Sequence, residues 1–324
     1  MIKIDIKDKK ILYHLHKNAR QSLTQIGKKV SLPKNVVSYR LKRLIKEGVI
    51  KNFSTVIDMN KLGYIIIRIH YLFQNVSSEI EKEIVNNFKD NTNTVLIATT
   101  QGLFNLKVII IVKDINKFYQ FWQETQKKYG SYIQKKSTAI FINEYYYGPY
   151  YLLDFDKKEQ RNIISKTGSG TTYKIDELDY KILQLLSANA RESLAKIANK
   201  LTVSTTTIKT RFEKLKKAGV IRGFRVIIDP SSYGYNTYKA YLYLTDYSKR
   251  NKIVEYLKNN PNLVFIDTYA GEADLDLEFH FYNISSFFKS MEDLSSIFPK
   301  TIKNFEYIYI LKYHKFLYMP EKWR

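Results

Sequence analysis

Two short stretches of this chain carry small polar and basic side chains at helical spacing, a combination suited to reading base pairs. One helical face of each stretch is apolar, formed by Val37, Leu41 and Leu44 in the first and by Ile208, Phe212 and Leu215 in the second. The outward positions are Lys34, Asn35, Ser38, Tyr39 and Lys42, and then Thr205, Thr206, Lys209, Thr210 and Glu213. Arg40 and Arg211 on the same stretches are further candidates for DNA contact. Asn, Lys, Arg, Ser and Thr side chains hydrogen-bond to base edges in the major groove. The chemistry that these stretches predict is recognition of double-stranded DNA.

Each stretch follows two shorter helical segments that would hold it in place. Asp5 can cap a helix with Asp8 in its first turn, and Ser22 can cap a second helix that Pro33 ends. The same order recurs after Asp176. Three short helices with a basic third helix are typical of a helix-turn-helix domain, whose third helix enters the groove. The alternative is a plain three-helix domain for protein contacts, but the exposed face is basic rather than apolar.

The reason for this recurrence is an internal duplication. Residues 5–64 align without a gap to residues 176–235, at an offset of 171 (176 minus 5). Asn18-Ala19-Arg20 meets Asn189-Ala190-Arg191, and Gly48-Val49-Ile50 meets Gly219-Val220-Ile221. A period this long indicates a duplicated domain pair, since solenoid units are about 20 to 50 residues long.

The two copies differ where they would meet DNA, so we expect them to prefer different half-sites. Pro33 stands where the second copy has Ser204, which removes a side-chain cap but still permits a helix to start. Beyond each third helix, residues 48–58 and 219–229 read as a short extended arm. There Lys51, Arg222 and Arg225 could contact the DNA backbone or lie at a solvated edge.

Positive charge is concentrated on the duplicated segments. The chain has a net charge of +22; residues 1–60 hold 14 Lys and Arg against 4 Asp and Glu, and residues 172–231 hold 12 against 6. These segments therefore carry +10 and +6, which leaves +6 for the other 204 residues. A general lysine bias would explain abundant lysine but not this distribution, which favours a polyanionic partner.

The segments between the helical domains predict a second kind of domain. Residues 64–151 and 237–311 each read as strand, helix, strand, strand, helix, strand, with turns at Gly102 and Gly271. This order is the ferredoxin-like βαββαβ arrangement, whose open sheet face, rich in Ile and Tyr, needs a partner. The predicted fold class is α+β. The predicted domains are helix-turn-helix domains at 1–60 and 173–231, ferredoxin-like domains at 61–153 and 232–324, the latter with an aromatic tail through Trp323, and a flexible linker at 154–172.

Composition narrows the remaining chemistry. The chain has 44% hydrophobic residues and no cysteine, so its cores must rest on packing without disulfides or thiolate ligands. Phosphate-binding loops, metal-ligand spacings and nucleophile elbows are missing from the sequence, so we predict neither a cofactor nor a metal. No apolar run reaches the roughly 18 residues that span a bilayer, and Met1 leads straight into the repeat without a signal peptide. We therefore expect a cytoplasmic protein with no membrane partner.

Taken together, the motifs resemble those of the Lrp/AsnC family of prokaryotic transcription regulators. The matching motifs are Asp-x-x-Asp-x-x-Ile-Leu, Asn-Ala-Arg, Gly-Val-Ile, an Asp ten residues after that glycine, and Gly-Tyr. The whole set occurs twice. The resemblance implies sequence-specific DNA binding and dimerisation through two ligand-sensing sheets packed face to face. Here one chain would supply both protomers as an intrachain pseudo-dimer, and larger homo-oligomers of whole chains stay open.

The resemblance also implies a small effector, such as an amino acid, at the turn between the second and third sheet strands. The family's Gly-x-x-Asp pattern is met by Gly271 and Asp274, whereas Gly102 is followed by Asn105. An Asp could hold an effector ammonium, and backbone amides near the glycine could hold its carboxylate. The alternative is a hairpin turn that binds nothing.

An enzyme is the competing interpretation, because fused chains of this kind also occur as sirohaem decarboxylases in haem synthesis. Those enzymes have an Arg-Arg-x-Gly-Ala stretch after the third helix, where this chain has Ile50-Lys51-Asn52-Phe53-Ser54 and Ile221-Arg222-Gly223-Phe224-Arg225. The only histidines are His14, His16, His70, His280 and His314. On these grounds the sequence favours a regulator that is not an enzyme.

Overall fold

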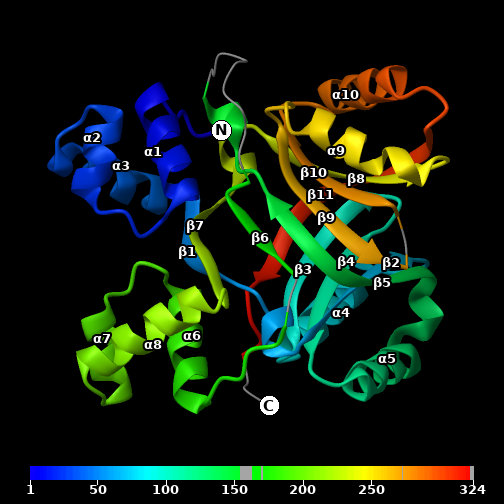
Figure 1. Ribbon diagram of the computed structural model, residues 1–324. Helices are drawn as coiled ribbons and strands as arrows, with labels where there is room; N and C mark the ends of the chain where they lie inside the picture. The colour runs from blue at the N-terminus through cyan, green and yellow to red at the C-terminus, as the bar shows by residue number, and fades with distance from the viewer. Residues whose placement is uncertain (154–162, 169–170, 272, 322–324) are drawn as a thin grey trace.

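A computed structural model shows two helical heads beside a continuous sheet (Figure 1). It describes residues 1–153, 163–168, 171–271 and 273–321. The linker positions 154–162 and 169–170, Glu272 of the second turn and the last three residues, Trp323 included, lie outside the described residues.

Each head is a three-helix domain with the caps that the sequence predicts. The first contains α1 (Ile6–Lys17), α2 (Leu23–Val30) and α3 (Lys34–Lys46), and the second contains α6 (Glu177–Ala188), α7 (Leu194–Leu201) and α8 (Thr205–Lys217). The Asp5 side chain accepts a hydrogen bond from the Asp8 amide, and the Asp8 side chain accepts one from the Asp5 amide, which forms a capping box. Asp176 and Asp179 repeat it. Pro33 provides no side-chain cap for α3, whereas Ser204 accepts from the Thr207 amide.

The arms that follow the third helices pair with each other. Strands β1 (Ile50–Ile57) and β7 (Ile221–Ile228) form an antiparallel two-stranded ribbon, in which Phe53 lies opposite Val226 and Thr55 opposite Phe224. The ribbon joins the two copies, so each head enters it from the opposite end. The extended arms predicted from the sequence are therefore an interface between the two halves.

The two ferredoxin-like units form one closed sheet. The first has β2 (Ile65–Phe73), α4 (Ser78–Asp90), β3 (Thr94–Gly102), β4 (Leu106–Val112), α5 (Ile115–Tyr129) and β5 (Ile133–Tyr146). The second has β8 (Asn236–Leu244), α9 (Arg250–Leu257), β9 (Leu263–Ala270), β10 (Leu275–Phe281), α10 (Ile284–Ile297) and β11 (Ile302–Phe316).

Strand pairing runs β2-β4-β3-β11-β8-β10-β9-β5 and returns to β2 through an additional β2–β5 pairing. The closure depends on long strands: β5 pairs with β2 along its first part and with β9 along its last, and β11 pairs in the same way with β8 and then β3. The sheet faces predicted to need a partner thus cover each other, and each of these eight strands has a neighbour on both sides.

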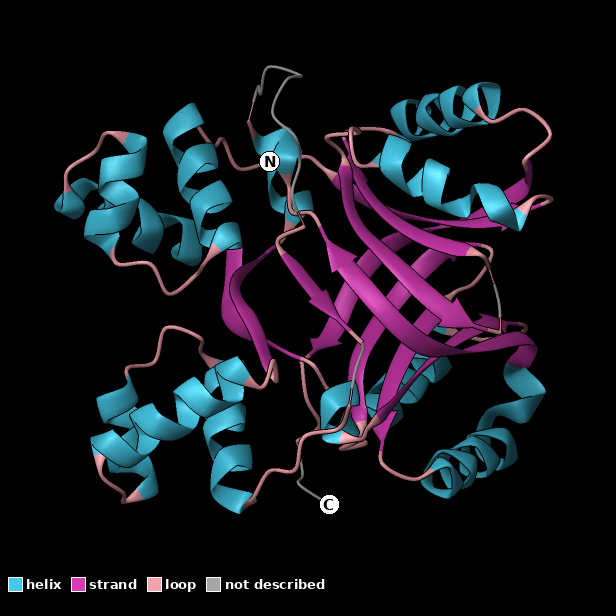
Figure 2. Ribbon diagram, viewed as in Figure 1, coloured by secondary structure: helices cyan, strands magenta, loops and turns pink. Residues whose placement is uncertain are grey.

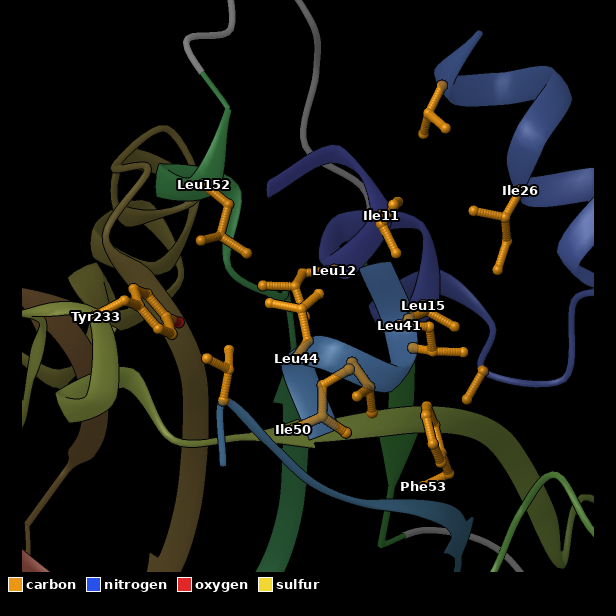
Figure 3. Close-up of a cluster of buried hydrophobic side chains, with 14 of the residues drawn as sticks. Ile11, Leu12, Leu15, Ile26, Leu41, Leu44, Ile50, Phe53, Leu152 and Tyr233 are labelled. Carbon is orange, nitrogen blue, oxygen red and sulfur yellow. The ribbon is translucent and has the colours of Figure 1, made fainter. Parts of the chain in front are cut away.

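The helices cover the outside of this ring, with α9 and α10 on one side and α4 and α5 on the other (Figure 2). Each helix pair buries its apolar stripe against its own sheet, as Phe287 and Met291 of α10 and Ile84 and Phe88 of α4 show. The first head has its own core, which includes Ile11, Leu12 and Leu44 (Figure 3). That core extends to Tyr233 and Tyr235 of the second half, whereas the core of the second head extends to Ile57 and Tyr64 of the first. Each head is therefore packed on the opposite half.

The structure departs from the predicted linker in one respect. Ser165–Thr167 form a short strand, β6, which pairs with Glu144–Tyr146 of β5. Gly168 follows with φ of 89°, and its amide donates to Asp58 Oδ2 at 3.1 Å. The prediction of a tether without structure was wrong for residues 165–168, because three residues are too few to show periodicity in the sequence.

Candidate nucleic-acid interface

The side chains proposed to read bases lie on the outer faces of α3 and α8. Most of them are exposed, namely Lys34, Asn35, Tyr39, Lys42, Thr205, Thr206, Lys209 and Thr210, and Ser38 is half-buried. Tyr39 has 70% of its surface exposed, unusual for a tyrosine that contributes to a core. The stripes Val37, Leu41, Leu44 and Ile208, Phe212, Leu215 are buried as predicted. The heads therefore present two faces with different hydrogen-bonding groups.

Arg40 and Arg211 belong to a different set. Arg40 Nη1 lies 2.6 Å from Asp5 Oδ2 and 2.9 Å from Asp8 Oδ1. Arg211 Nη1 lies at the same distances from Asp176 Oδ2 and Asp179 Oδ1. These ion pairs bind the third helix to the capping box of the first helix, and they raise the pKa of both arginines. The role that the structure supports for the pair is to hold the reading helix in place.

The repeated Asn-Ala-Arg motif joins the heads to each other. The Ala19 amide donates to Phe224 O at 2.8 Å, and the Ala190 amide donates to Phe53 O at 2.7 Å. Arg20 Nη1 donates to the carbonyl oxygen of Glu192 at 3.0 Å, and Arg191 Nη1 donates to that of Gln21 at 3.1 Å. This reciprocal contact fixes the distance between the reading helices, a role that the motif alone does not reveal.

Two reciprocal ion pairs support the same interface. Lys51 Nζ lies 3.2 Å from Asp229 Oδ2, and Arg222 Nε lies 3.2 Å from Asp58 Oδ2. The members of each pair come from opposite halves. Lys51 is exposed and so lies at a solvated edge as predicted, Arg222 is half-buried, and both side chains stabilise the ribbon. Arg225, the third basic residue of these arms, is buried.

A cluster of buried charges lies inside the closed sheet. Its members are Arg68, Lys107, Glu144, Arg225, Lys239, Asp267, Asp276 and Glu278, which are all buried or nearly so. Arg68 pairs with Asp276 across the two halves. Lys239 Nζ lies 2.9 Å from Asp267 Oδ2 and 3.0 Å from Asp276 Oδ1. The sequence signal was single charges inside apolar strands, such as Lys107 between Leu106 and Val108, but the strands alone did not show that the charges converge.

The cluster shifts the ionisation of its members. Burial, together with the positive charge of Lys239, lowers the pKa of Lys107 to about 7. Burial raises the pKa of Glu144 to about 7, against the opposing effect of Arg225. Burial alone would raise the pKa of Glu278, but the hydrogen bond from His280 and the charge of Lys239 lower it to about 2.

The turn residues predicted to bind an effector have structural partners. Asn105 Oδ1 accepts from the Phe73 amide at 2.8 Å, and Asp274 Oδ2 accepts from the Leu244 amide at 2.7 Å. Gly102 and Gly271 adopt φ of 116° and 107°, which favours glycine. Asn can replace Asp at this turn because one side-chain oxygen suffices for the backbone contact. The second carboxylate oxygen of Asp274 is what distinguishes the two turns.

Two further observations concern other classes of site. Among the described residues, no group of three His, Asp or Glu side chains is arranged to hold a metal ion. A search of the same residues finds no helix of the length and apolarity that crossing a membrane requires. His16, His70 and His280 are buried, and each shares a hydrogen bond with a tyrosine hydroxyl, that of Tyr146, Tyr241 and Tyr151, respectively.

Fold and interface together define a tandem helix-turn-helix protein whose two sensing-type sheets close on each other within one chain. The model of the winged helix-turn-helix DNA-binding family matches residues 4–51, and the AsnC-type helix-turn-helix domain model matches residues 175–216. The chain is 33% identical over 121 residues to the transcriptional regulator Ptr1 of Methanocaldococcus jannaschii, a match that covers 37% of this chain and 80% of Ptr1. It is 26% identical over 141 residues to the regulator FL11 of Pyrococcus horikoshii, covering 44% and 92%. The chain belongs to the Lrp/AsnC family of helix-turn-helix transcriptional regulators.

The regulators Ptr1 and FL11 each match less than half of this chain, whereas one solved structure matches nearly all of it. The crystal structure of the sirohaem decarboxylase NirDL superimposes with a TM-score of 0.62 at 12% identity, covering 96% of this chain and 93% of NirDL. Its complex with an iron-uroporphyrin III analogue gives 0.63, also at 12% identity. The likeness establishes a shared fold. Our prediction that the protein is not an enzyme rested on the missing Arg-Arg-x-Gly-Ala stretch and on the small number of histidines. It was wrong, because the fold of nearly the whole chain is that of a solved enzyme.

Proposed function

We propose that this protein is a sequence-specific DNA-binding regulator that reads two unlike half-sites with the two heads of one chain. The observation that carries the proposal is the pair of reading helices with different exposed side chains, held at a fixed separation by the Arg20 and Arg191 contacts. In a symmetric dimer the half-sites would be identical. Because the two heads differ, we expect an asymmetric operator. We also propose that the protein acts in the cytoplasm.

The assignment of DNA contacts follows from exposure and partners. Lys34, Lys42 and Lys209 are exposed cations on the reading faces, suited to phosphates or guanine edges. Asn35, Ser38, Tyr39, Thr205, Thr206 and Thr210 supply the remaining hydrogen-bonding groups. An amino acid or another small effector at the turns of Gly102 to Asn105 and Gly271 to Asp274 stays part of the proposal. The group for an ammonium would be Asp274 Oδ1, to which no described residue donates a hydrogen bond.

Selection of bound fragments from the host genome, followed by titration at several salt concentrations, tests the proposal. Binding should weaken steeply with salt, because cations that neutralise phosphates release counterions. The matched variants are Lys42→Ala and Lys209→Ala for the two heads, with Lys113→Ala, between β4 and α5 and outside both helix-turn-helix domains, as the control. The proposal would be contradicted if the affinity for duplex DNA did not change with salt and was the same in the wild type, Lys42→Ala and Lys209→Ala.

Sirohaem decarboxylation is a second candidate, favoured by the match to NirDL over almost the whole chain. The cavity between the sheets measures about 150 Å³, which is below the roughly 300 Å³ at which pockets for drug-sized ligands begin. A tetrapyrrole would therefore require the sheets to move apart. Incubation of the purified protein with sirohaem, with the absorbance spectrum followed over time, decides this: a spectrum that converts to a decarboxylated product supports the enzyme, and an unchanged spectrum excludes it.

A further inference from the structure

A cavity of about 150 Å³ lies inside the closed sheet and reaches the ribbon that carries the heads. One part of its wall is apolar, formed by Ile66, Ile109, Ile111, Phe141 and Phe265. Another part is polar, with Lys107, Arg225 and Asp267 among its residues. An engineered protein cavity of about this size holds benzene, so there is room for a small organic molecule.

Lys107 is the feature of this cavity that calls for a ligand. Its side chain is buried, with only 4% of its surface exposed. The other cations of the cluster have carboxylate partners: Arg68 with Asp276, Lys239 with Asp267, and Arg225 with Glu144. Within the described part of the chain, Lys107 forms no such pair. A buried cation without a counterion is strongly unfavourable, and a bound anion would remove that cost.

Other polar groups near the cavity are also unsatisfied. Arg225 is 3% exposed and lies over the rings of Tyr146, Phe265 and Tyr318, but its Nε and Nη1 atoms have no geometrically sound hydrogen-bond acceptor among the described residues. The Oδ1 atom of Asp267 has no donor there either. The free groups are thus mainly donors, which suit a carboxylate, and there is one acceptor. Buried polar groups are almost always paired, so several unpaired ones around one cavity indicate an occupant.

We propose that this cavity binds a small organic carboxylate with an apolar body, whose carboxylate pairs with Lys107. The apolar wall would hold the body of the ligand, which excludes a bare inorganic anion. If the ligand also carries an ammonium, Asp267 Oδ1 is the acceptor within the cavity. The site is separate from the turns at Gly102 and Gly271, and it lies inside the closed sheet rather than on its surface.

The position of the site connects it to the heads. Val56 and Ile57 of β1 and Arg225 of β7 belong to its wall, together with Met59 and Asn60 just beyond β1. A ligand there would contact both strands of the ribbon that joins the heads, and so would bias their relative position. This link to DNA rests on the proposed function, whereas binding of the carboxylate does not.

The test measures binding to the full chain without DNA, by calorimetry and by thermal shift. The probes are 4-methylpentanoate, its uncharged isostere 4-methylpentanamide, L-leucine and inorganic phosphate. The carboxylates should bind saturably and raise the melting temperature, with the amide weaker by roughly tenfold or more because it lacks the charge. Phosphate should have no effect. Since this comparison uses the wild-type chain, it does not depend on any variant folding.

Variants then locate the site. Lys107→Met should lose carboxylate binding, whereas the same substitution at the exposed Lys113, beyond the end of β4, should leave it unchanged. Tighter binding of L-leucine than of 4-methylpentanoate, abolished in Asp267→Asn, would identify an amino acid as the source of the carboxylate. Equal binding of acid and amide, unchanged affinity in Lys107→Met, or a cavity that takes up solvent only would overturn the proposal. A shift in DNA affinity on adding the carboxylate is measured separately, so failure of DNA binding leaves this result intact.

Discussion

Replacement of Lys107 by Met should stabilise the protein at neutral pH, by an amount that falls as the pH rises. The reason is that the folded chain buries this ammonium and no described carboxylate forms an ion pair with it, whereas the unfolded chain leaves it in water. Methionine has a similar length and no charge, so the substitution removes the desolvation cost and keeps most of the packing.

The magnitude follows from the two pKa values of Lys107. The pKa is about 7 in the folded chain, and its ordinary value is 10.5. Between these values the unfolded state binds more protons than the folded state, so wild-type stability rises with pH by about 1.4 kcal/mol per unit. Over the difference of about 3.5 units, this single group accounts for about 5 kcal/mol as an order of magnitude. The gain from Lys107→Met should therefore be largest at pH 7 and below, and should vanish as the pH approaches 10.5.

Urea unfolding of the wild type, Lys107→Met and the control Lys113→Met, each at neutral pH and at about pH 9.5, measures this difference. The comparison between variants cancels the titration of all other groups. A Met variant that is less stable than the wild type at pH 7, or one whose advantage is the same at both pH values, would refute the reasoning.

Three further substitutions address other parts of the account. Arg211→Met should lower the free energy of unfolding by about 1 kcal/mol, because it removes partly exposed ion pairs to Asp176 and Asp179. Unlike Lys209→Ala, it should leave the salt dependence of DNA binding unchanged. A weaker salt dependence would show that Arg211 binds phosphate instead. Gly168→Ala should cost roughly 2 kcal/mol or more in thermal unfolding, since a Cβ there would lie 2.1 Å from Ile142 O at a φ of 89°; unchanged stability would mean that β6 does not hold this turn. Arg20→Met should lower the free energy of unfolding by about 1–2 kcal/mol, because it leaves the carbonyl groups of Ala190 and Glu192 without this donor. The variant should also tolerate a wider range of half-site spacings in operators selected from random DNA. A spacing as strict as that of the wild type would rule out a role for Arg20 in holding the heads together.

The fold could be predicted largely because its signals are local or repeated. Capping residues such as Asp5 and Ser22 mark helix starts, and the period of apolar residues separates α3 from β2. The gapless duplication then supplied the second copy. The sequence did not predict that β5 and β11 each pair with strands of both halves, because those partners are far away in the sequence.

The site could be predicted only in part, for a physical reason. Exposure of Lys42 or Lys209 follows from helical position alone, but the ion pairs of Arg40 join residues that are 32 and 35 positions apart. The head-to-head contacts of Arg20 and the buried cluster around Lys107 depend on which faces of the two halves meet. The residue pattern within one segment does not show which faces of the two halves meet. In addition, an enzyme and a regulator can share the resulting fold.

Footprinting of a selected operator with the wild type, Lys42→Ala and Lys209→Ala tests most directly whether unlike heads read unlike half-sites. Protection by the wild type should cover both half-sites. Each variant should lose protection first over a different half-site, with a loss of about 1–3 kcal/mol in binding at that position. Loss of protection over the same half-site in both variants, or no loss in either, would contradict the account.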